Sequence, residues 1–215
     1  MAWHPLVLSL QVASLATVVV LVVGLGLALL LARARFPGRS VVDALVNLPL
    51  VLPPSVLGFY LLFVLGRGGP VRDLLGINIL FTWMAAVIAS ATVALPLMVR
   101  TSKAAIESVD PNLEKAARTL GVPEWRVIKE VTVPLASRGI VAGLVLAFAR
   151  ALGEFGATLM VAGNIPGRTQ TAPLAIYDLV QSNRIREANV LVLIMTVVSF
   201  VVLLGVGRWQ KTWWR

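Results

Sequence analysis

Residues 110–134 read DPNLEKAARTLGVPEWRVIKEVTVP, and the rest of the chain has a different character. Eight charged residues fall between Asp110 and Glu130, whereas the 215-residue chain as a whole is 58% hydrophobic and only 13% charged. That overall composition is typical of integral membrane proteins. Because charged side chains are costly in lipid, the stretch is predicted to lie outside the membrane, between two spans.

Local signals divide this stretch into two short amphipathic helices. Asp110 is a typical N-cap residue, Pro111 suits the first helical position, and Gly121 is placed to end the first helix. The predicted apolar stripe of that helix is Leu113, Ala117 and Leu120. The second helix begins at Pro123 and ends before Pro134, and its predicted stripe is Trp125, Ile128 and Val131. Composition leaves two interpretations open: a loop that packs back on the spans, or a docking surface for a soluble partner.

Five apolar segments are long enough to cross a membrane, which takes about 20 residues. They lie at roughly 6–32, 41–65, 79–99, 137–162 and 189–207. The second contains Pro49, Pro53 and Pro54, which predict a kink or an unwound turn. The sequence therefore predicts one all-α membrane domain over residues 1–215, with a polar loop at 100–136.

The distribution of basic residues predicts the orientation of these spans. Thirteen Lys and Arg residues lie on one side, in 33–39, 100–138 and 208–215, and five lie on the other, in 67–72 and 168–186. Basic residues collect on the cytoplasmic side of membrane proteins. The N-terminus is therefore predicted outside and the C-terminus, with the 110–134 stretch, in the cytoplasm. This bias also accounts for the net charge of +9 without a nucleic-acid partner.

Residues for catalysis are scarce. The chain has no cysteine, and its one histidine, His4, stands without a cluster of acids at metal-ligand spacing. The segment GNIPGRT (163–169) imitates a phosphate-binding loop, but its glycines are too close together and Arg168 replaces the lysine. We expect no catalytic residue, metal or cofactor in this chain, so an ATP-driven process needs a separate ATPase. A secondary transporter, a membrane enzyme and an assembly subunit are the competing interpretations.

Two charges inside the fourth span are the main candidates for a translocation pathway. Arg150 and Glu154 are four residues apart and can pair on one helix face. A neutralised pair that fixes the span is favoured over an anion site, because a strong fixed cation would trap a dianion. The other pathway candidates are Asn47, Pro53, Pro54, Ser55, Ser90, Thr92 and Thr158, with helix packing as the competing role. Gly139 and Gly143 form a G-x-x-x-G pair suited to close helix contact, with a dimer seam as one possible location.

The 110–134 stretch resembles the cytoplasmic loop of ABC importer permeases, whose pattern is E-A-A, three residues, G, nine residues, I-x-L-P. The residues in register are Ala116, Ala117, Gly121 and Pro134. Lys115 occupies the acidic slot, with Glu114 immediately before it, and Val131 and Val133 replace the Ile and Leu. The resemblance implies that this loop couples a partner ATPase to the spans. The implied coupling residues are Glu114, Lys115, Ala116, Ala117, Leu120, Gly121, Trp125 and Pro134.

The resemblance covers nearly the whole chain. Residues 49–69 and 149–177 are similar to the molybdate and sulfate class of these permeases, and the molybdate subtype is the closer match. It implies a five-span bundle of the type I importer kind in a prokaryotic inner membrane. The implied partners are a second permease copy, two ATPase subunits that bind ATP and Mg²⁺, an external oxyanion-binding protein and membrane lipid. The implied substrate is molybdate or tungstate, with sulfate or thiosulfate as the alternative.

Overall fold

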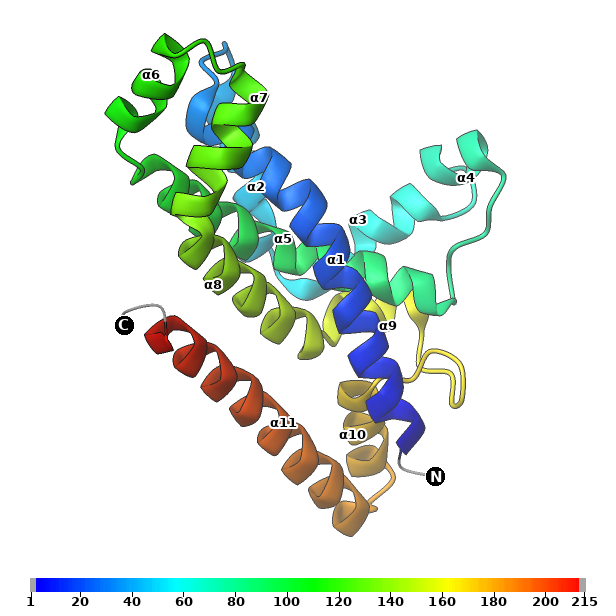
Figure 1. Ribbon diagram of the computed structural model, residues 1–215. Helices are drawn as coiled ribbons and strands as arrows, with labels where there is room; N and C mark the ends of the chain where they lie inside the picture. The colour runs from blue at the N-terminus through cyan, green and yellow to red at the C-terminus, as the bar shows by residue number, and fades with distance from the viewer. Residues whose placement is uncertain (1–2, 213–215) are drawn as a thin grey trace.

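The computed structural model describes residues 3–212, apart from the side chains of Leu75, Leu203 and residues 205–212. The cations at Arg208, Lys211 and Arg215, which enter the charge count, therefore lie outside the described side chains. Every regular element in the described part is helical (Figure 1). The helices are α1 (Trp3–Arg33), α2 (Arg39–Asn47), η1 (Leu48–Leu50), α3 (Pro54–Leu65), α4 (Pro70–Leu75), α5 (Trp83–Glu107), α6 (Pro111–Thr119), α7 (Glu124–Val127), η2 (Ile128–Thr132), α8 (Val133–Leu152), α9 (Gly156–Ala162), α10 (Ala172–Gln181) and α11 (Ile185–Thr212).

Five helical segments in the described chain are long and apolar enough to cross a membrane. They are Trp3–Arg33, Pro54–Leu74, Trp83–Glu107, Glu124–Leu152 and Ile185–Val202. Figure 1 shows α6 and α7 at one end of the molecule, and α10 with the N-terminus of α1 at the opposite end. The 110–134 stretch therefore connects α5 and α8 at one end of the spans, as the sequence predicts.

The centre of the molecule is the contact of α1, α5 and α8. On α1 the residues buried in this contact recur at helical spacing: Ala13, Ala16, Val20, Gly24, Ala28 and Leu31. Small residues let the backbones approach closely, and a Cβ added at Gly24 would lie 2.9 Å from Cγ of Met98 on α5. Gly139 and Gly143 of α8 face Ala105 and Thr101 of α5 in the same way. The G-x-x-x-G pair therefore packs within one chain.

The second predicted span, 41–65, is divided into separate helices. α2 ends at Asn47, and after η1 the backbone is extended at Pro53 before α3 begins at Pro54. The prolines fix their own φ angles and have no N–H to donate, so a single helix cannot run through them. α2 has no buried residue and is joined to α5 by the ion pairs Arg39–Glu107 at 3.2 Å and Lys103–Asp43 at 2.7 Å. The apolar span starts at Pro54, later than predicted.

The fourth predicted span, 137–162, differs at both ends. One continuous helix runs from Glu124 to Leu152, so the prediction that a separate helix stops before Pro134 is wrong. Residues Ile128–Thr132 form a π turn, in which Val133 N donates to Ile128 O. The regular bonding pattern is already interrupted there, so Pro134 in the next turn removes little. The helix then ends at Leu152, and α9 starts at Gly156 after a break.

Helix α10 was not predicted, because residues 163–188 were interpreted as a connection. Pro173 stands in its first turn and the apolar residues Leu174 and Ala175 are buried. It packs against α1 and α11 in a small core that includes Leu6 and Leu191. The signal was a proline followed by a short apolar run, which is too brief to distinguish a helix from a loop by periodicity alone.

Gly139→Ala is expected to lower the stability of the bundle. The added Cβ would lie 2.3 Å from Cβ of Ala105, and overpacking costs about 1–3 kcal/mol, more than the roughly 0.5–1 kcal/mol that alanine gains over glycine in a helix. Gly26→Ala in α1 is the matched control, because a Cβ there meets nothing within 4 Å. Unfolding midpoints measured in detergent should fall for the first variant and stay or rise for the second. Equal midpoints would contradict the close contact of α5 and α8.

Candidate functional site

The turn between α6 and α7 is built by capping and by one ion pair. Asp110 caps α6, with its Oδ1 accepting from Asn112 N at 2.9 Å. Gly121 has φ +78°, a left-handed conformation that suits glycine and ends the helix. Arg118 then holds Glu124 across the turn through two hydrogen bonds of 2.7 Å. The hydrogen bond to Glu124 raises the pKa of the Arg118 guanidinium above its ordinary value, so this clamp keeps its cation at every physiological pH.

The outer face of this turn is apolar and open. Leu120 is 83% exposed and Trp125 is 59% exposed, and Leu113 is also exposed. Lys115, Ala116 and Gly121 are exposed beside them, and Ala117 is half-buried. The predicted stripe of α6 is therefore not packed against the spans, which argues against the first of the two interpretations of this loop. In α7 the buried anchor is Val127, not the predicted Trp125. The Arg126 guanidinium lies 5.2 Å from the Trp125 ring centre and restrains that side chain.

Glu114 points the other way. Its side chain is 5% exposed and its Oε1 lies 2.6 Å from Nη2 of Arg33, the last residue of α1. The same oxygen accepts from Thr132 Oγ1 at 2.7 Å, and Oε2 lies 3.5 Å from Arg118 Nη2. The sequence placed Glu114 among residues that contact a partner, whereas its contacts here are internal. The sequence did not predict a role for Arg33 or Thr132. Arg33 was counted only as a basic residue beside a span, and Thr132 was not singled out.

The helix breaks that precede α3 and α9 lie next to each other. A Cβ added at Gly156, where α9 begins, would lie 2.7 Å from Cβ of Pro54, where α3 begins. Gly58 meets Ala157 and Met160 in the same contact of α3 with α9. The pathway candidates Pro53, Pro54 and Ser55 are exposed at this break. The interrupted second and fourth spans therefore meet at their breaks.

The Arg150–Glu154 ion pair spans the break between α8 and α9 in the fourth predicted span. Arg150 Nη1 lies 2.9 Å from Glu154 Oε2, and the Glu154 side chain is 2% exposed. Glu154 is not on the same helix as Arg150, because α8 ends at Leu152. Its Oε1 accepts instead from Ala157 N at 2.8 Å, in the first turn of α9. The carboxylate thus satisfies a free backbone N–H of α9 while it neutralises Arg150.

The remaining pathway candidates are spread over α2, α5 and α9. Asn47 ends α2 and donates to Asp43 O at 2.7 Å. Thr92 Oγ1 donates to Ile88 O at 2.8 Å, within α5. Ser90 is buried in α5. Thr158 in α9 is 1% exposed, and its hydroxyl has no hydrogen-bond partner among the described residues.

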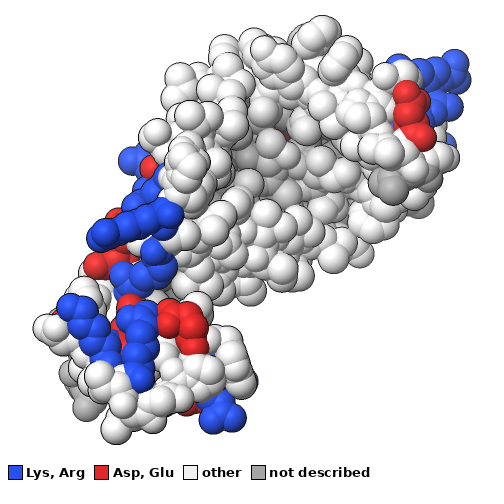
Figure 2. Space-filling view, turned by 90° about the horizontal axis from the view of Figure 1, so that it is seen from above, with Lys and Arg blue, Asp and Glu red and all other residues white. Residues whose placement is uncertain are grey.

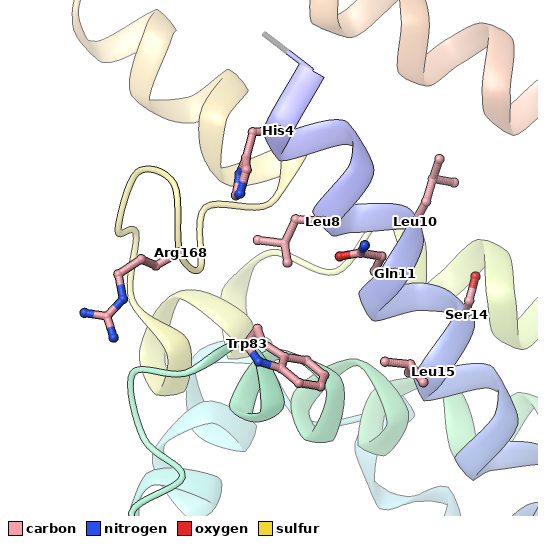
Figure 3. Close-up of a pocket in the computed structure, with 8 residues that line it drawn as sticks. All are labelled: His4, Leu8, Leu10, Gln11, Ser14, Leu15, Trp83 and Arg168. Carbon is pink, nitrogen blue, oxygen red and sulfur yellow. The ribbon is translucent and has the colours of Figure 1, made fainter. Parts of the chain in front are cut away.

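A cavity of about 750 Å³ lies at the opposite end of the molecule from α6, beside the N-terminal turns of α1. Its lining residues are His4, Leu8, Leu10, Gln11, Ser14, Leu15, Trp83 and Arg168. Figure 3 shows His4 turned toward the cavity, whereas Arg168 extends away from the other residues. Arg168 belongs to the 163–169 segment, where Thr169 Oγ1 accepts from Ile165 N at 3.1 Å and closes a turn. Arg168 is the one Lys or Arg among these lining residues, and because it extends away from them the cavity is not a built anion site.

Comparisons with known proteins agree with this architecture. The chain is 44% identical over 211 residues to the molybdenum transport system permease protein ModB of Escherichia coli, covering 96% of this chain and 92% of that protein. It is 42% identical to ModB of Haemophilus influenzae, covering 94% and 90%, and 35% identical to the sulfate transport system permease protein CysT of Escherichia coli, covering 90% and 71%.

Solved structures show the same fold at low sequence identity. The inward-facing MetNI methionine ABC transporter matches with a TM-score of 0.73 at 19% identity, covering 98% of this chain and 93% of that one. A bacterial ABC transporter that imports alginate matches with a TM-score of 0.79 at 20% identity, covering 97% and 78%. The family model of binding-protein-dependent transport system inner membrane components matches residues 11–212. The chain therefore belongs to the family of inner membrane components of binding-protein-dependent transport systems.

Proposed function

We propose that this chain is the permease subunit of an ATP-driven importer of molybdate or tungstate. Two copies form the translocation pathway, two ATPase subunits bind the α6–α7 turn, and an external binding protein delivers the oxyanion. The observation that carries this proposal is the exposed apolar face of the α6–α7 turn at one end of five apolar spans. The relatives named above that are most similar in sequence are molybdenum transport permeases, which supports the substrate class.

The proposed orientation places α6 and α7 in the cytoplasm and the N-terminus of α1 outside. Figure 2 shows charged side chains gathered mainly over the α6–α7 end of the face in view, with a smaller group over α4 and a nearly uncharged middle. Helix α4 contains Arg72 and Asp73 and lies in the connection predicted outside. The larger basic group sits on the side that the positive-inside rule assigns to the cytoplasm.

The α6–α7 face fits a soluble protein better than lipid. Leu120 and Trp125 stand beside the charged residues Lys115, Arg118 and Glu124, a mixture that lipid would not solvate. Burying an exposed leucine contributes about 1.5–3 kcal/mol, so a partner that covers two such side chains gains substantial affinity. Small residues at Ala116 and Gly121 allow the partner's backbone to approach. The ion pair of Arg118 with Glu124 spans the turn that carries both anchors.

The pathway that we propose runs past the two adjacent helix breaks. The second and fourth spans are interrupted at Pro53 and at Gly153–Phe155, where backbone groups can meet water or substrate. Because Glu154 neutralises Arg150, the fold presents no isolated cation there that would hold a dianion tightly. Much of the surface of every span except α5 is open in one chain, including Phe59, Tyr60 and Phe63 of α3. Lipid and the second copy cover these surfaces in the proposed dimer.

The proposed function is tested by reconstitution. The chain, its ATPase and its binding protein are placed in liposomes, and uptake of molybdate, tungstate and sulfate is measured with and without ATP. We expect ATP-dependent uptake of molybdate and tungstate and much weaker uptake of sulfate. Uptake that persists without ATP would show a secondary transporter instead. Preference for sulfate would show a sulfate permease instead, a class of relative to which the sequence identity is lower.

Leu120→Arg is expected to release the ATPase subunits. The side chain is 83% exposed, so the substitution leaves the fold of the permease intact while it places a cation in the apolar contact. Recovery of ATPase on a tagged permease should fall by at least about tenfold, the factor that corresponds to about 1.4 kcal/mol. Leu120→Ala should give a smaller loss, and both variants should keep the parent's unfolding midpoint. Full recovery with the arginine variant would place the partner elsewhere.

Gly121→Val is expected to separate ATP hydrolysis from uptake. A Cβ at this position meets nothing within 4 Å, so the effect comes from the φ of +78°, which a β-branched residue adopts only with strain. The angle between α6 and α7 should change while the ATPase still binds. The measurement is oxyanion imported per ATP hydrolysed. A ratio equal to that of the parent would mean that the angle is not used for coupling.

Glu154→Gln is expected to destabilise the fourth span, because Arg150 loses its counter-charge at a site where the carboxylate is almost fully buried. Breaking such a pair costs about 3–5 kcal/mol when both partners are buried, and less here since Arg150 is partly exposed. The double variant Arg150→Met with Glu154→Gln should recover part of the lost unfolding midpoint. Recovery of stability without recovery of uptake would assign the pair to the pathway, and recovery of both would assign it to structure.

A further inference from the structure

We infer that Glu114 is a positioning residue that works from inside the fold. Together with Arg33 it fastens α6 to the ends of α1 and α5 and to the head of α8. A partner that pushes on the outer face of α6 then moves three spans as one body. This inference rests on the proposed function, because it assumes that a partner binds the α6–α7 turn.

Glu114 cannot serve as a surface contact in this arrangement. The residue is 3% exposed, whereas Leu120 on the same turn is 83% exposed. Three donors already surround its carboxylate: Arg33, Thr132 and Arg118. Successive residues of an α-helix are about 100° apart around its axis, so Lys115 projects outward where Glu114 projects inward. The acid at position 114 therefore does not replace an acid at position 115 but has a different task.

A single nitrogen of Arg33, at the end of α1, bonds both α5 and α6. Its Nη2 donates to Glu114 Oε1 at 2.6 Å and to Ile106 O at 2.8 Å. Ile106 lies in the last turn of α5, where its carbonyl oxygen also accepts from Val109 N at 3.2 Å, and Arg33 is itself the last residue of α1. A cation is favourable at both helix C-termini. One guanidinium thus ties the ends of α1 and α5 to α6.

Thr132 adds the third span. It is 1% exposed and ends the π turn that joins α7 to α8, and its hydroxyl donates to the same Oε1 of Glu114. π turns inside long helices occur often at functional sites, because they create a local change in the direction of the chain. Charge-assisted hydrogen bonds gain strength when water is excluded, as it is around this carboxylate. The network is therefore stiff at the point where α6 meets the spans.

The inference is tested on the complete complex of permease, ATPase and binding protein in liposomes. The variants are Glu114→Gln, Arg33→Met and their combination. The matched controls are Glu130→Gln and Arg35→Met, which change exposed side chains of the same kinds nearby. Two quantities are measured for each: the ATPase retained on a tagged permease, and the molybdate imported per ATP hydrolysed.

We expect both variants to retain the ATPase and to import about tenfold less molybdate per ATP, the factor typical of one lost charge-assisted hydrogen bond. The combined variant should lose little more than either single one, because both act through the same pair. Thr132→Val, which removes only one hydroxyl donor, should lower the ratio in the same direction by a smaller factor. If the charge variants fold poorly, the import ratio of Thr132→Val tests the inference instead.

Three outcomes would overturn the inference. Loss of ATPase binding in Glu114→Gln would make this residue a docking contact, and an unchanged import ratio in all three variants would show that the network transmits nothing. Additive losses in the combined variant would show that Arg33 and Glu114 act separately. Lack of ATP-dependent uptake by the unsubstituted complex is a different result, since it would overturn the proposed function itself.

Discussion

Lipid supplies no hydrophobic force between apolar helices, so the contact of α1, α5 and α8 depends on how closely their backbones can pack. Glycine and alanine line this contact, with Gly24 against Met98 and Gly139 against Ala105. The other elements depend on it. α6 and α7 connect α5 to α8, and α2 is joined to α5 by ion pairs. Any change in the spacing of these three helices reaches the α6–α7 turn directly.

The two buried acids solve related problems at different depths. Glu154 lies at a break in a span, where it satisfies Ala157 N and neutralises Arg150. Glu114 lies where the loop meets the spans, and it gathers Arg33 and Thr132. In both places an unpaired charge would be costly, so each acid fixes the geometry of the elements around it. The chain uses its few internal charges to hold interrupted helices in place.

The fold could be predicted further than the site. Apolar runs gave the five spans, and Pro53 and Pro54 gave the break in the second, because these signals are local. Pro134 led to a wrong prediction of a helix end. A proline normally ends a helix, but here it follows a π turn and the helix continues. The break after Leu152 was missed because Gly153 and Glu154 sit in an apolar run without a proline. Helix α10 was missed because its apolar run is short.

The sequence by itself determined that the chain is an all-helical membrane protein with one polar loop, because composition and the length of apolar runs are set by lipid. It also indicated that Gly139 and Gly143 suit close helix contact, whereas the small residues of α1 that line the central contact were found only in the structure. Only the tertiary structure decided the directions of Glu114 and Lys115. They are neighbours in sequence, but about 100° of helix rotation turns one toward Arg33 and the other toward solvent. That direction depends on how α6 is seated on α1 and α8, which no local pattern specifies.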